Sequence, residues 1–354
     1  DLIEEGEEAS GEQTDEELLI EENDETAEQI PDNDYDELEN FLVEDVEIDK
    51  LLFFSPFTGM PVTERSLEKA IMVSIENTKQ ARPQSGLESA SIIYEFLVEG
   101  GITRFMALYR RGLPEKVGPV RSLRPYLIEL AQEYNALLLH AGASPEGFAM
   151  LKEVDIESLD QLYNGNYYWR SIDRPSPHNL YTGINKISPY LNRITGLEYS
   201  DRFPFQHISF VKEDDSKADY IRIHFWGGSR VSYRYDPDGN VYKRFYSLEE
   251  KPHLTDRGEQ LTARNIIVQY VKTRVIDDIG RLEMELQGNG QALVFRDGIL
   301  IEGYWEKHSG EWTRFYENNG QEIKLNPGQT WIEVVPTSTN IEYGSEQSGS
   351  EELR

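Results

Sequence analysis

Two arginines stand beside the expected start of a helix in the segment 118–125, which reads GPVRSLRP. Ser122 can act as the N-terminal cap of a helix over 123–134, so that Arg124 falls in its first turn. The helix dipole disfavours a cation at this end, and a nearby anion would offset that cost. Free backbone N–H groups, together with Arg121 and Arg124, could therefore bind an anionic ligand. The alternative is an internal salt bridge to one of three carboxylates: Glu95, Glu99 or Glu129.

His140 ends an apolar run over 136–140 and precedes Ser144 and Pro145, which are typical of a helix start. Open α/β sheets bind ligands at this end of their strands, so His140 could donate a hydrogen bond or act as a general base. A structural histidine at a strand end is the other interpretation. Ser144 is expected to be a helix cap and not a nucleophile, because G-x-S-x-G requires glycine where Glu146 stands.

A proline-stiffened loop, DRPSPHN at 173–179, supplies two further polar side chains. His178 and Asn179 could line the rim of a pocket. Alternatively, their side chains bond to the local backbone of a turn.

Two carboxylates, Glu95 and Glu99, follow an apolar run and could act as a paired acid and base. An enzymatic site of this kind would require one of them to meet His140 in a single cleft. The alternative is that both carboxylates pair with neighbouring arginines such as Arg82 and Arg104.

Metal and nucleotide sites are not predicted. The six histidines show no H-x-x-x-H or H-E-x-x-H spacing, and there are no cysteines. The DPDGN sequence at 236–240 resembles the start of a calcium loop, but Val241 and Ser247 occupy the positions that need Gly and Glu. Neither a Walker A loop nor G-x-G-x-x-G is present, so no cofactor is expected.

Charge is concentrated at one end of the chain. Residues 1–50 hold 23 Asp or Glu against Lys50 alone, a net charge of −22 out of −30 for all 354 residues. Such acidity repels nucleic acid, which is therefore not an expected partner. No apolar run of 18 residues occurs, so no transmembrane segment is predicted.

The composition predicts four parts in the chain: a disordered acidic tether at 1–48, an α/β layered domain with the candidate site at 49–214, a β-rich (α+β) domain at 218–337, and a flexible tail at 338–354. In the first domain, expected strands at 70–75, 92–97, 104–109 and 136–140 accompany the helix at 123–134. The charged segment KEDDSKAD at 212–219 is the expected boundary. Beyond it, residues alternate with period two between hairpin turns such as Asp238-Gly239 and Asp297-Gly298.

Six segments resemble the YerB-like (DUF3048) family of bacterial cell-envelope lipoproteins: ARPQSGLESASIIYEFLVEGGITRFMALYRR, VGPVRSLRPY, LLLHAGASPEG, RPSPHNLYT, GRLEMELQGNGQALVF and LNPGQTWIEVVP. The resemblance covers roughly residues 50–337. It departs from the family at SIEN (74–77), where an Asp-Asn pair is common, and at LLLHAGAS, where a second glycine is common. The positions that match the family pattern are Arg82, Pro83, Gly86, Glu95, Glu99, Gly100, Gly101, Arg104, Gly118, Pro119, Arg121, Arg124, His140, Gly142, Pro177, His178 and Asn179.

The resemblance implies an extracytoplasmic protein on the outer face of the cell membrane, anchored through a lipidated cysteine upstream of Asp1. We therefore expect a binding or scaffolding module whose partner is an envelope polymer, an anionic small molecule or an envelope protein. The candidate ligand-binding residues are Arg104, Arg121, Arg124, His140, His178 and Asn179. The alternative is a hydrolase of an envelope polymer that uses Glu95 or Glu99 with His140.

Overall fold

The structure is a computed structural model that describes residues 53–62, 69–110, 112–194, 203–206, 211–212, 215–246 and 250–345. The predicted acidic tether at 1–48 and the residues from 346 onward lie outside the described residues. Among the described helices, none is long and apolar enough to cross a membrane.

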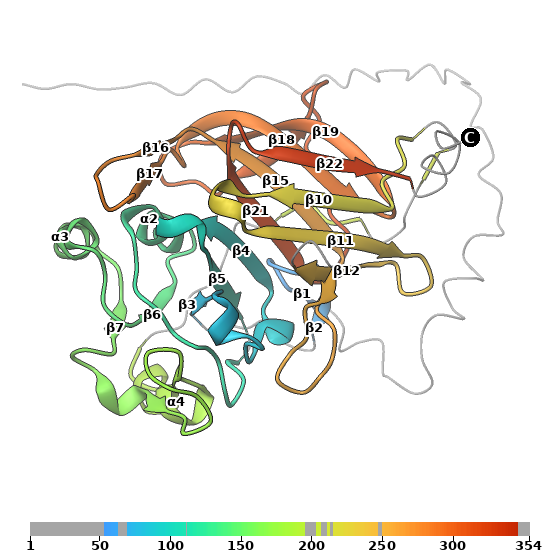
Figure 1. Ribbon diagram of the computed structural model, residues 1–354. Coiled ribbons are helices and arrows are strands. Elements are labelled where there is room, and N and C mark those ends of the chain that lie inside the picture. The colour runs from blue at the N-terminus through green and yellow to red at the C-terminus, as the bar shows by residue number, and fades with distance from the viewer. Residues whose placement is uncertain are drawn as a thin grey trace, which may run out of the picture. The chain divides into compact units, whose positions relative to one another are not determined.

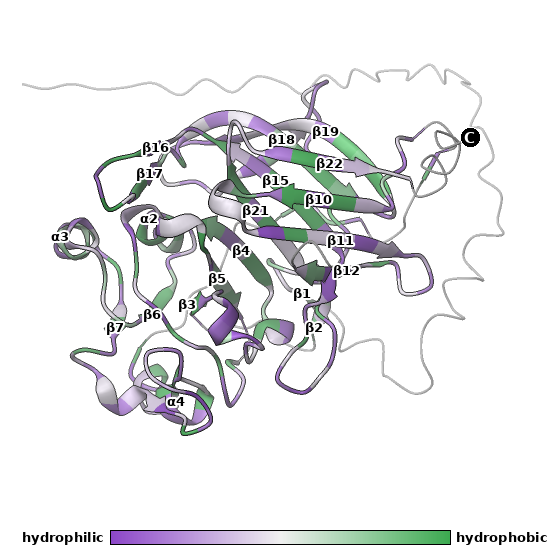
Figure 2. Ribbon diagram, in the orientation of Figure 1, coloured by the Kyte–Doolittle hydropathy of each residue, from purple (hydrophilic) through white to green (hydrophobic). Residues whose placement is uncertain are grey.

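A ten-stranded sheet forms the larger part of the fold, in the order β20-β19-β18-β15-β21-β4-β5-β3-β6-β7 (Figure 1). The apolar runs that predict strands at 92–97 and 104–109 correspond to β4 and β5, whose residues are almost all buried. Figure 2 shows β4 and β15 coloured largely as apolar, as expected for strands covered on both faces. The strands are β3 (Ile71–Glu76), β4 (Ile92–Leu97), β5 (Thr103–Tyr109), β6 (Leu137–His140), β7 (Ser158–Asp160), β15 (Asn265–Val271), β18 (Gly288–Arg296), β19 (Ile299–Lys307), β20 (Arg314–Glu317) and β21 (Thr330–Pro336).

The predicted fold class is confirmed, since the chain forms a two-domain fold that is mostly sheet with few helices. The two predicted domains nevertheless share the ten-stranded sheet and do not have separate ones. β21 from the second domain lies parallel to β4 from the first, with Trp331 opposite Ile93 and Glu333 opposite Glu95. Every residue of β21 is buried, which identifies a central strand but not its neighbour, so the sequence pattern could not reveal the junction.

A six-stranded sheet covers one face of this junction. Its order is β13-β12-β11-β10-β22, and β14 pairs with β12. It packs on the larger sheet where Tyr233 of β11 meets the ring of Trp331 of β21, with ring centroids 6.5 Å apart. The strands are β10 (Tyr220–His224), β11 (Arg230–Asp236), β12 (Val241–Tyr246), β13 (Lys251–Pro252), β14 (Thr262–Ala263) and β22 (Asn340–Gly344). The remaining strands form three two-stranded sheets: β1 (Phe53–Phe54) with β2 (Pro61–Val62), β8 (Trp169–Arg170) with β9 (Leu180–Tyr181), and β16 (Thr273–Val275) with β17 (Leu282–Met284).

Strand β22 corrects the expectation of a flexible tail from residue 338. It pairs antiparallel with β10 and places Ile341 opposite Ile223. The Ser/Gly/Glu-rich composition of the C-terminal residues conceals this short strand, whose partner lies about 120 residues earlier in the chain.

The helices are short. They are α2 (Pro125–Glu133), α3 (Pro145–Glu153) and α4 (Ile184–Leu191), with 3-10 turns η2 (Lys79–Ala81), η3 (Leu87–Ser89), η4 (Glu99–Gly101), η5 (Gly165–Tyr167) and η6 (Trp226–Gly228). Ser144 caps α3 as predicted, because its hydroxyl accepts the Gly147 N–H at 3.1 Å. The predicted cap of α2 is wrong: the cap position is Arg124 and not Ser122. Pro125 explains the shift, since proline favours the first helical position and holds the residue before it extended.

Two glycine turns, η4 and η6, meet where the smaller sheet crosses the end of β4. A Cβ atom at Gly227 would lie 2.4 Å from the Cα atom of Gly101, and both glycines have positive φ angles, +75° and +69°. Ser229 reinforces the contact by donating its hydroxyl hydrogen to the Gly101 carbonyl at 2.6 Å. Only residues without a side chain allow the two backbones to approach so closely.

We expect Gly227→Ala to lower the free energy of unfolding by about 3 kcal/mol, because it adds a steric clash to an unfavourable backbone conformation. Gly228→Ala is the matched control. Gly228 also has a positive φ, +97°, but a Cβ atom added there would meet no atom within 4 Å, so a loss of about 1 kcal/mol is expected. Urea denaturation measures both, and equal losses would show that the close approach is unimportant.

Candidate functional site

The two arginines predicted to bind a ligand form internal ion pairs. The Arg124 guanidinium forms two hydrogen bonds with the Glu99 carboxylate, one of them 2.7 Å from Nη2 to Oε2. Arg121 pairs with Glu76, with Nη2 to Oε1 and Nε to Oε2 both at 2.9 Å. Burial alone would raise the pKa of Glu76, but hydrogen bonds from Arg121, Thr78 and His178 lower it overall. The structure therefore favours internal salt bridges for both arginines, although only Arg124 pairs with one of the three expected carboxylates and Arg121 pairs with Glu76 instead.

Arg104 is half-buried and lies close to the charges of Arg124, Glu99 and Arg121. Its Nη1 donates to the Ser122 carbonyl at 2.6 Å. Burial lowers the pKa of Arg104 to about 10, and the charge of Arg124 acts in the same direction. Arg104 thus fixes the backbone that carries Ser122, in front of α2.

His140 is fully buried and uses both ring nitrogens. Nδ1 lies 2.9 Å from the Gly142 carbonyl, so it carries the hydrogen, and Nε2 accepts from the Ser158 hydroxyl at 2.6 Å. Burial lowers the pKa of His140, which favours this neutral form. His140 on β6 is separated from Glu95 on β4 by the two strands β3 and β5. The cleft that the hydrolase alternative requires is therefore not formed by these residues.

The side chains of the loop residues His178 and Asn179 have different hydrogen-bond partners. His178 Nδ1 lies 2.8 Å from Glu76 Oε1, so the structure brings it together with Arg121. Asn179 closes the β8–β9 turn, accepting from Arg170 at 2.9 Å and donating to the Ser171 carbonyl at 2.8 Å. The predicted set is thus divided among several local networks.

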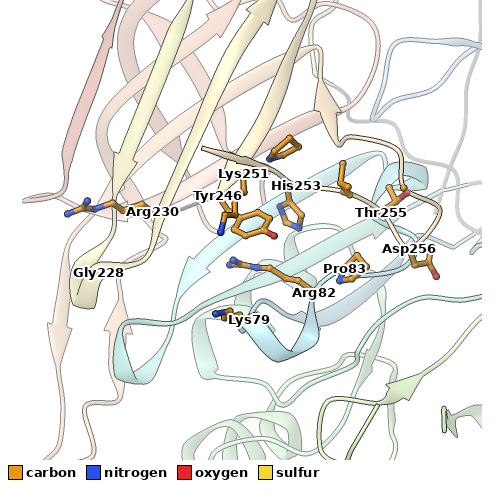
Figure 3. Close-up of a pocket in the computed structure, with 13 residues that line it drawn as sticks. Lys79, Arg82, Pro83, Gly228, Arg230, Tyr246, Lys251, His253, Thr255 and Asp256 are labelled. Atoms are coloured by element: carbon orange, nitrogen blue, oxygen red, sulfur yellow. The ribbon is translucent and has the colours of Figure 1, made fainter. Parts of the chain in front are cut away.

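A different site lies where η2 faces the β11, β12 and β13 strands of the smaller sheet. This site, called here the cationic pocket, is an open cavity of about 980 Å³ (Figure 3). Its lining residues are Lys79, Arg82, Pro83, Gly228, Arg230, Tyr246, Lys251, Pro252, His253, Leu254, Thr255, Asp256 and Gly258. Four are Lys or Arg, and one is acidic. The acidic residue, Asp256, is engaged by Ser85 at 2.6 Å and by Lys116 at 3.2 Å.

Three of the pocket cations form no ion pair within the described residues: Lys79, Arg82 and Arg230. Several other arginines, such as Arg121, Arg124 and Arg244, do have a carboxylate partner. An acidic protein that leaves three cations unpaired in one cavity has a local electrostatic preference for anions.

Arg82 is held in position from two sides. Its Nε and Nη2 donate to Asn77, at 2.9 Å to the side-chain oxygen and 3.1 Å to the carbonyl oxygen. Arg174, from the proline loop, donates to the carbonyl oxygens of Ala81 and Pro83 on either side of it. The guanidinium carbon then lies 4.5 Å from the ring centre of Tyr246, and Figure 3 shows the two side chains facing each other.

The floor of the pocket is a neutral histidine. His253 Nδ1 accepts from Arg244 Nε at 3.1 Å, so its hydrogen is on Nε2, which lies 2.8 Å from Gln84 Oε1. Burial lowers the pKa of His253 well below its usual value, and Arg244 and Arg82 lower it further. With both nitrogens engaged, His253 has no free position from which to act as a base.

Beneath His253, a buried ion cluster joins the two sheets. Arg244 of β12 pairs with Glu95 of β4 and, at 2.9 Å, with Glu333 of β21; all three side chains are at most 2% exposed. Burial raises the pKa of Glu333 to about 8, and the neighbouring charge of Glu95 adds to this effect. Glu333 Oε2 accepts no hydrogen bond, and the raised pKa favours the protonated form of this carboxyl group.

Sequence reasoning missed most of the cationic pocket. Arg82 and Pro83 matched the family pattern, but Arg82 was expected to pair with a carboxylate. Arg230, Tyr246 and Lys251 belong to hairpins whose polar residues are typical of solvated turns. No spacing in the sequence links them to η2, about 150 residues earlier. Among the described residues, no group of three His, Cys, Asp or Glu could hold a metal ion.

The fold is that of a two-domain protein made mostly of β-sheet. Two family models match the chain, "Protein of unknown function (DUF3048) N-terminal domain" at residues 57–196 and "Protein of unknown function (DUF3048) C-terminal domain" at residues 221–332. The protein belongs to this family.

A sequence comparison and a structure comparison both match the chain to the same bacterial protein. The chain is 29% identical over 289 residues to "Putative lipoprotein YerB" of Bacillus subtilis (strain 168), covering 80% of this chain and 86% of that protein. The crystal structure of YerB protein from Bacillus subtilis matches with a TM-score of 0.72 and 30% identity, over 82% of this chain and 99% of that one. The resemblance inferred from the sequence motifs is thereby confirmed.

Replacing Arg244 by Met should lower the free energy of unfolding by about 3–5 kcal/mol, because it leaves Glu95 and Glu333 buried without a cation. The control is Arg234→Met. Arg234 pairs with Glu250 at the surface, where its side chain is 38% exposed, so a loss of at most about 1 kcal/mol is expected. Chemical denaturation of both variants tests this, and similar losses would contradict a special role for the buried cluster.

The raised pKa of Glu333 predicts that stability falls as the pH rises. Between the ordinary value of 4.5 and about 8, the folded state binds one more proton than the unfolded state. The free energy of unfolding should therefore decrease across that window, by up to about 1.4 kcal/mol per pH unit. Glu333→Gln keeps a donor toward Glu95 without titrating, so its unfolding free energy should change less between pH 5 and 8. The exposed Glu302→Gln serves as control and should follow the wild type; a parallel slope in Glu333→Gln would refute the assignment.

Proposed function

We propose that this protein is a lipid-anchored protein of the cell envelope that binds an anionic ligand in the cationic pocket. The single observation that carries the binding role is that Lys79, Arg82 and Arg230 line one cavity and none of them has an ion-pair partner in the described part of the chain. The envelope location is supported by the relative that is named a lipoprotein.

The chemistry of the pocket favours binding over catalysis. Its histidine is neutral and doubly hydrogen-bonded, so it cannot act as the base that a general acid–base mechanism needs. General acid–base catalysis requires a side chain that can exchange a proton with the substrate. The hydrolase alternative would also need Glu95 or Glu99, and both carboxylates already have cationic partners, Glu95 in Arg244 and Glu99 in Arg124.

Scaffolding is a second candidate, favoured by one surface feature. The β16–β17 hairpin exposes Val275, Ile276 and Ile279, and exposed apolar residues in one segment can contact a protein partner. This role involves a different part of the surface and is compatible with anion binding in the pocket.

Anion binding can be tested on the full chain with inorganic phosphate, by isothermal titration calorimetry at low salt. We expect Lys79→Ala and Arg230→Ala each to weaken phosphate binding about tenfold, the effect of about 1.4 kcal/mol that one lost charged contact can have. The affinity of the wild type should also fall as the salt concentration rises.

Arg193→Ala is the matched control, since it removes one exposed arginine just after α4, outside the pocket. It should leave phosphate binding unchanged. If Arg193→Ala weakens binding as much as Arg230→Ala, the attraction belongs to the general surface charge and the proposed site is wrong.

A further inference from the structure

The two ends of the cationic pocket differ in charge, and this difference bears on what ligand the proposed anion site would take. Figure 3 shows Arg230 at one end and Asp256 with Thr255 at the other, with Arg82 and Tyr246 between them. An anionic group is attracted to the first end and repelled by the carboxylate at the second. A ligand that fills the pocket therefore needs an anionic end and an uncharged, hydrogen-bonding end.

Asp256 has an acceptor position left for a ligand. Its Oδ2 atom receives both protein contacts, from Ser85 at 2.6 Å and from Lys116 at 3.2 Å. No described residue donates a side-chain or backbone hydrogen bond to Oδ1. An ionised carboxylate can only accept hydrogen bonds, so the group that suits this position is a hydroxyl.

Between the two ends, the wall offers flat and apolar surface. Tyr246 lies there with Pro83, Pro252 and Leu254. A ring that carries hydroxyl groups at its edge and C–H groups on its faces fits such a surface. The cavity of about 980 Å³ is also at the upper end of the range for small-molecule sites, and far larger than a lone phosphate ion requires.

The cationic end indicates the type of anion. Lys79, Arg82 and Arg230 supply three positive charges from three different elements. A carboxylate carries one negative charge and two oxygens, whereas a phosphate monoester carries about −1.5 to −2 at neutral pH and three acceptor oxygens. Phosphate matches a cavity lined by three cations better.

We infer that the cationic pocket binds a phosphorylated sugar, with its phosphate group at Lys79, Arg82 and Arg230 and a sugar hydroxyl donating to Asp256 Oδ1. This inference rests on the proposed anion-binding function and adds the ligand class. A free sugar phosphate carries this monoester, whereas one linked through its phosphate to a polymer or lipid is a diester with a single negative charge; both present phosphate oxygens together with sugar hydroxyls.

The test is calorimetric titration of the full chain with three probes: inorganic phosphate, glucose and glucose 1-phosphate. Glucose 1-phosphate should bind at least about tenfold more tightly than either of the others, because only it combines a phosphate group with sugar hydroxyls. The methyl diester of glucose 1-phosphate identifies the source of the ligand. Tight binding of the diester assigns a linked sugar phosphate, and binding of the monoester alone assigns a free one.

Substitutions at Asp256 separate the sugar contact from the phosphate contact. Asp256→Ala should weaken glucose 1-phosphate about tenfold while leaving inorganic phosphate unchanged or slightly tighter, whereas Arg230→Ala should weaken both. Lys116→Ala is the matched control, because it breaks the same ion pair but retains the carboxylate acceptor, and it should keep the affinity for glucose 1-phosphate within about twofold. If Asp256→Ala does not fold, Ser85→Ala with Asp256 intact should retain binding, and Asp256→Asn should retain only part of it.

The possible failures are distinguishable. If inorganic phosphate does not bind to the wild type, the proposed function fails and this inference fails with it. If phosphate binds but glucose 1-phosphate is no tighter, or if Asp256→Ala weakens both probes equally, only the sugar assignment is overturned.

Discussion

The fold depends on one buried ion cluster at the point where its two sheets meet. Arg244 extends from the smaller sheet into the space above β4 and β21, and it finds a carboxylate on each of these strands. Removing such charges from water is costly, and the cost is offset only when every charge has a partner in good geometry. A different register between β4 and β21 would separate Glu95 from Glu333 and leave Arg244 incompletely paired. The cluster therefore specifies how the N-terminal and C-terminal segments align.

The same cluster determines the properties of the cationic pocket above it. Arg244 fixes the tautomer of His253 through its Nε hydrogen, and Glu95 anchors Asn77, which in turn holds Arg82. The pocket wall is thus connected to the sheet junction by side-chain hydrogen bonds and not only by packing. Such networks fix side-chain geometry more firmly than isolated surface residues can. This explains how the open cationic pocket can hold the Arg82 guanidinium in a fixed position without a direct ion pair.

Many strands and helices of the fold could be predicted from the sequence, because local residue patterns determine where such elements form. Apolar runs marked β4 and β5, and the Ser144-Pro145 pair marked the start of α3. The α2 cap was misplaced because the effect of Pro125 on its neighbour outweighed the capping ability of Ser122. The candidate site could be predicted from the sequence only in part. That Arg124 needs an anion followed from the helix dipole, and Glu99 was among the carboxylates considered. The cationic pocket, in contrast, is created by strand pairing between distant segments, and a residue such as Arg230 shows no sign of its partners in its own neighbourhood.

The position of β21 has a consequence for how the chain reaches its native state. This strand, near the C-terminal end of the fold, lies between β15 and β4 in the middle of the large sheet. During synthesis or export, the β4 edge remains without its permanent neighbour until residue 336 has emerged, and an unpaired apolar edge invites association with other chains. A polypeptide that ended before Thr330 would lack the centre of its sheet and not merely a terminal strand. Completion of the molecule thus coincides with the arrival of almost its last structured segment, which makes folding an event of the whole chain rather than of its halves in turn.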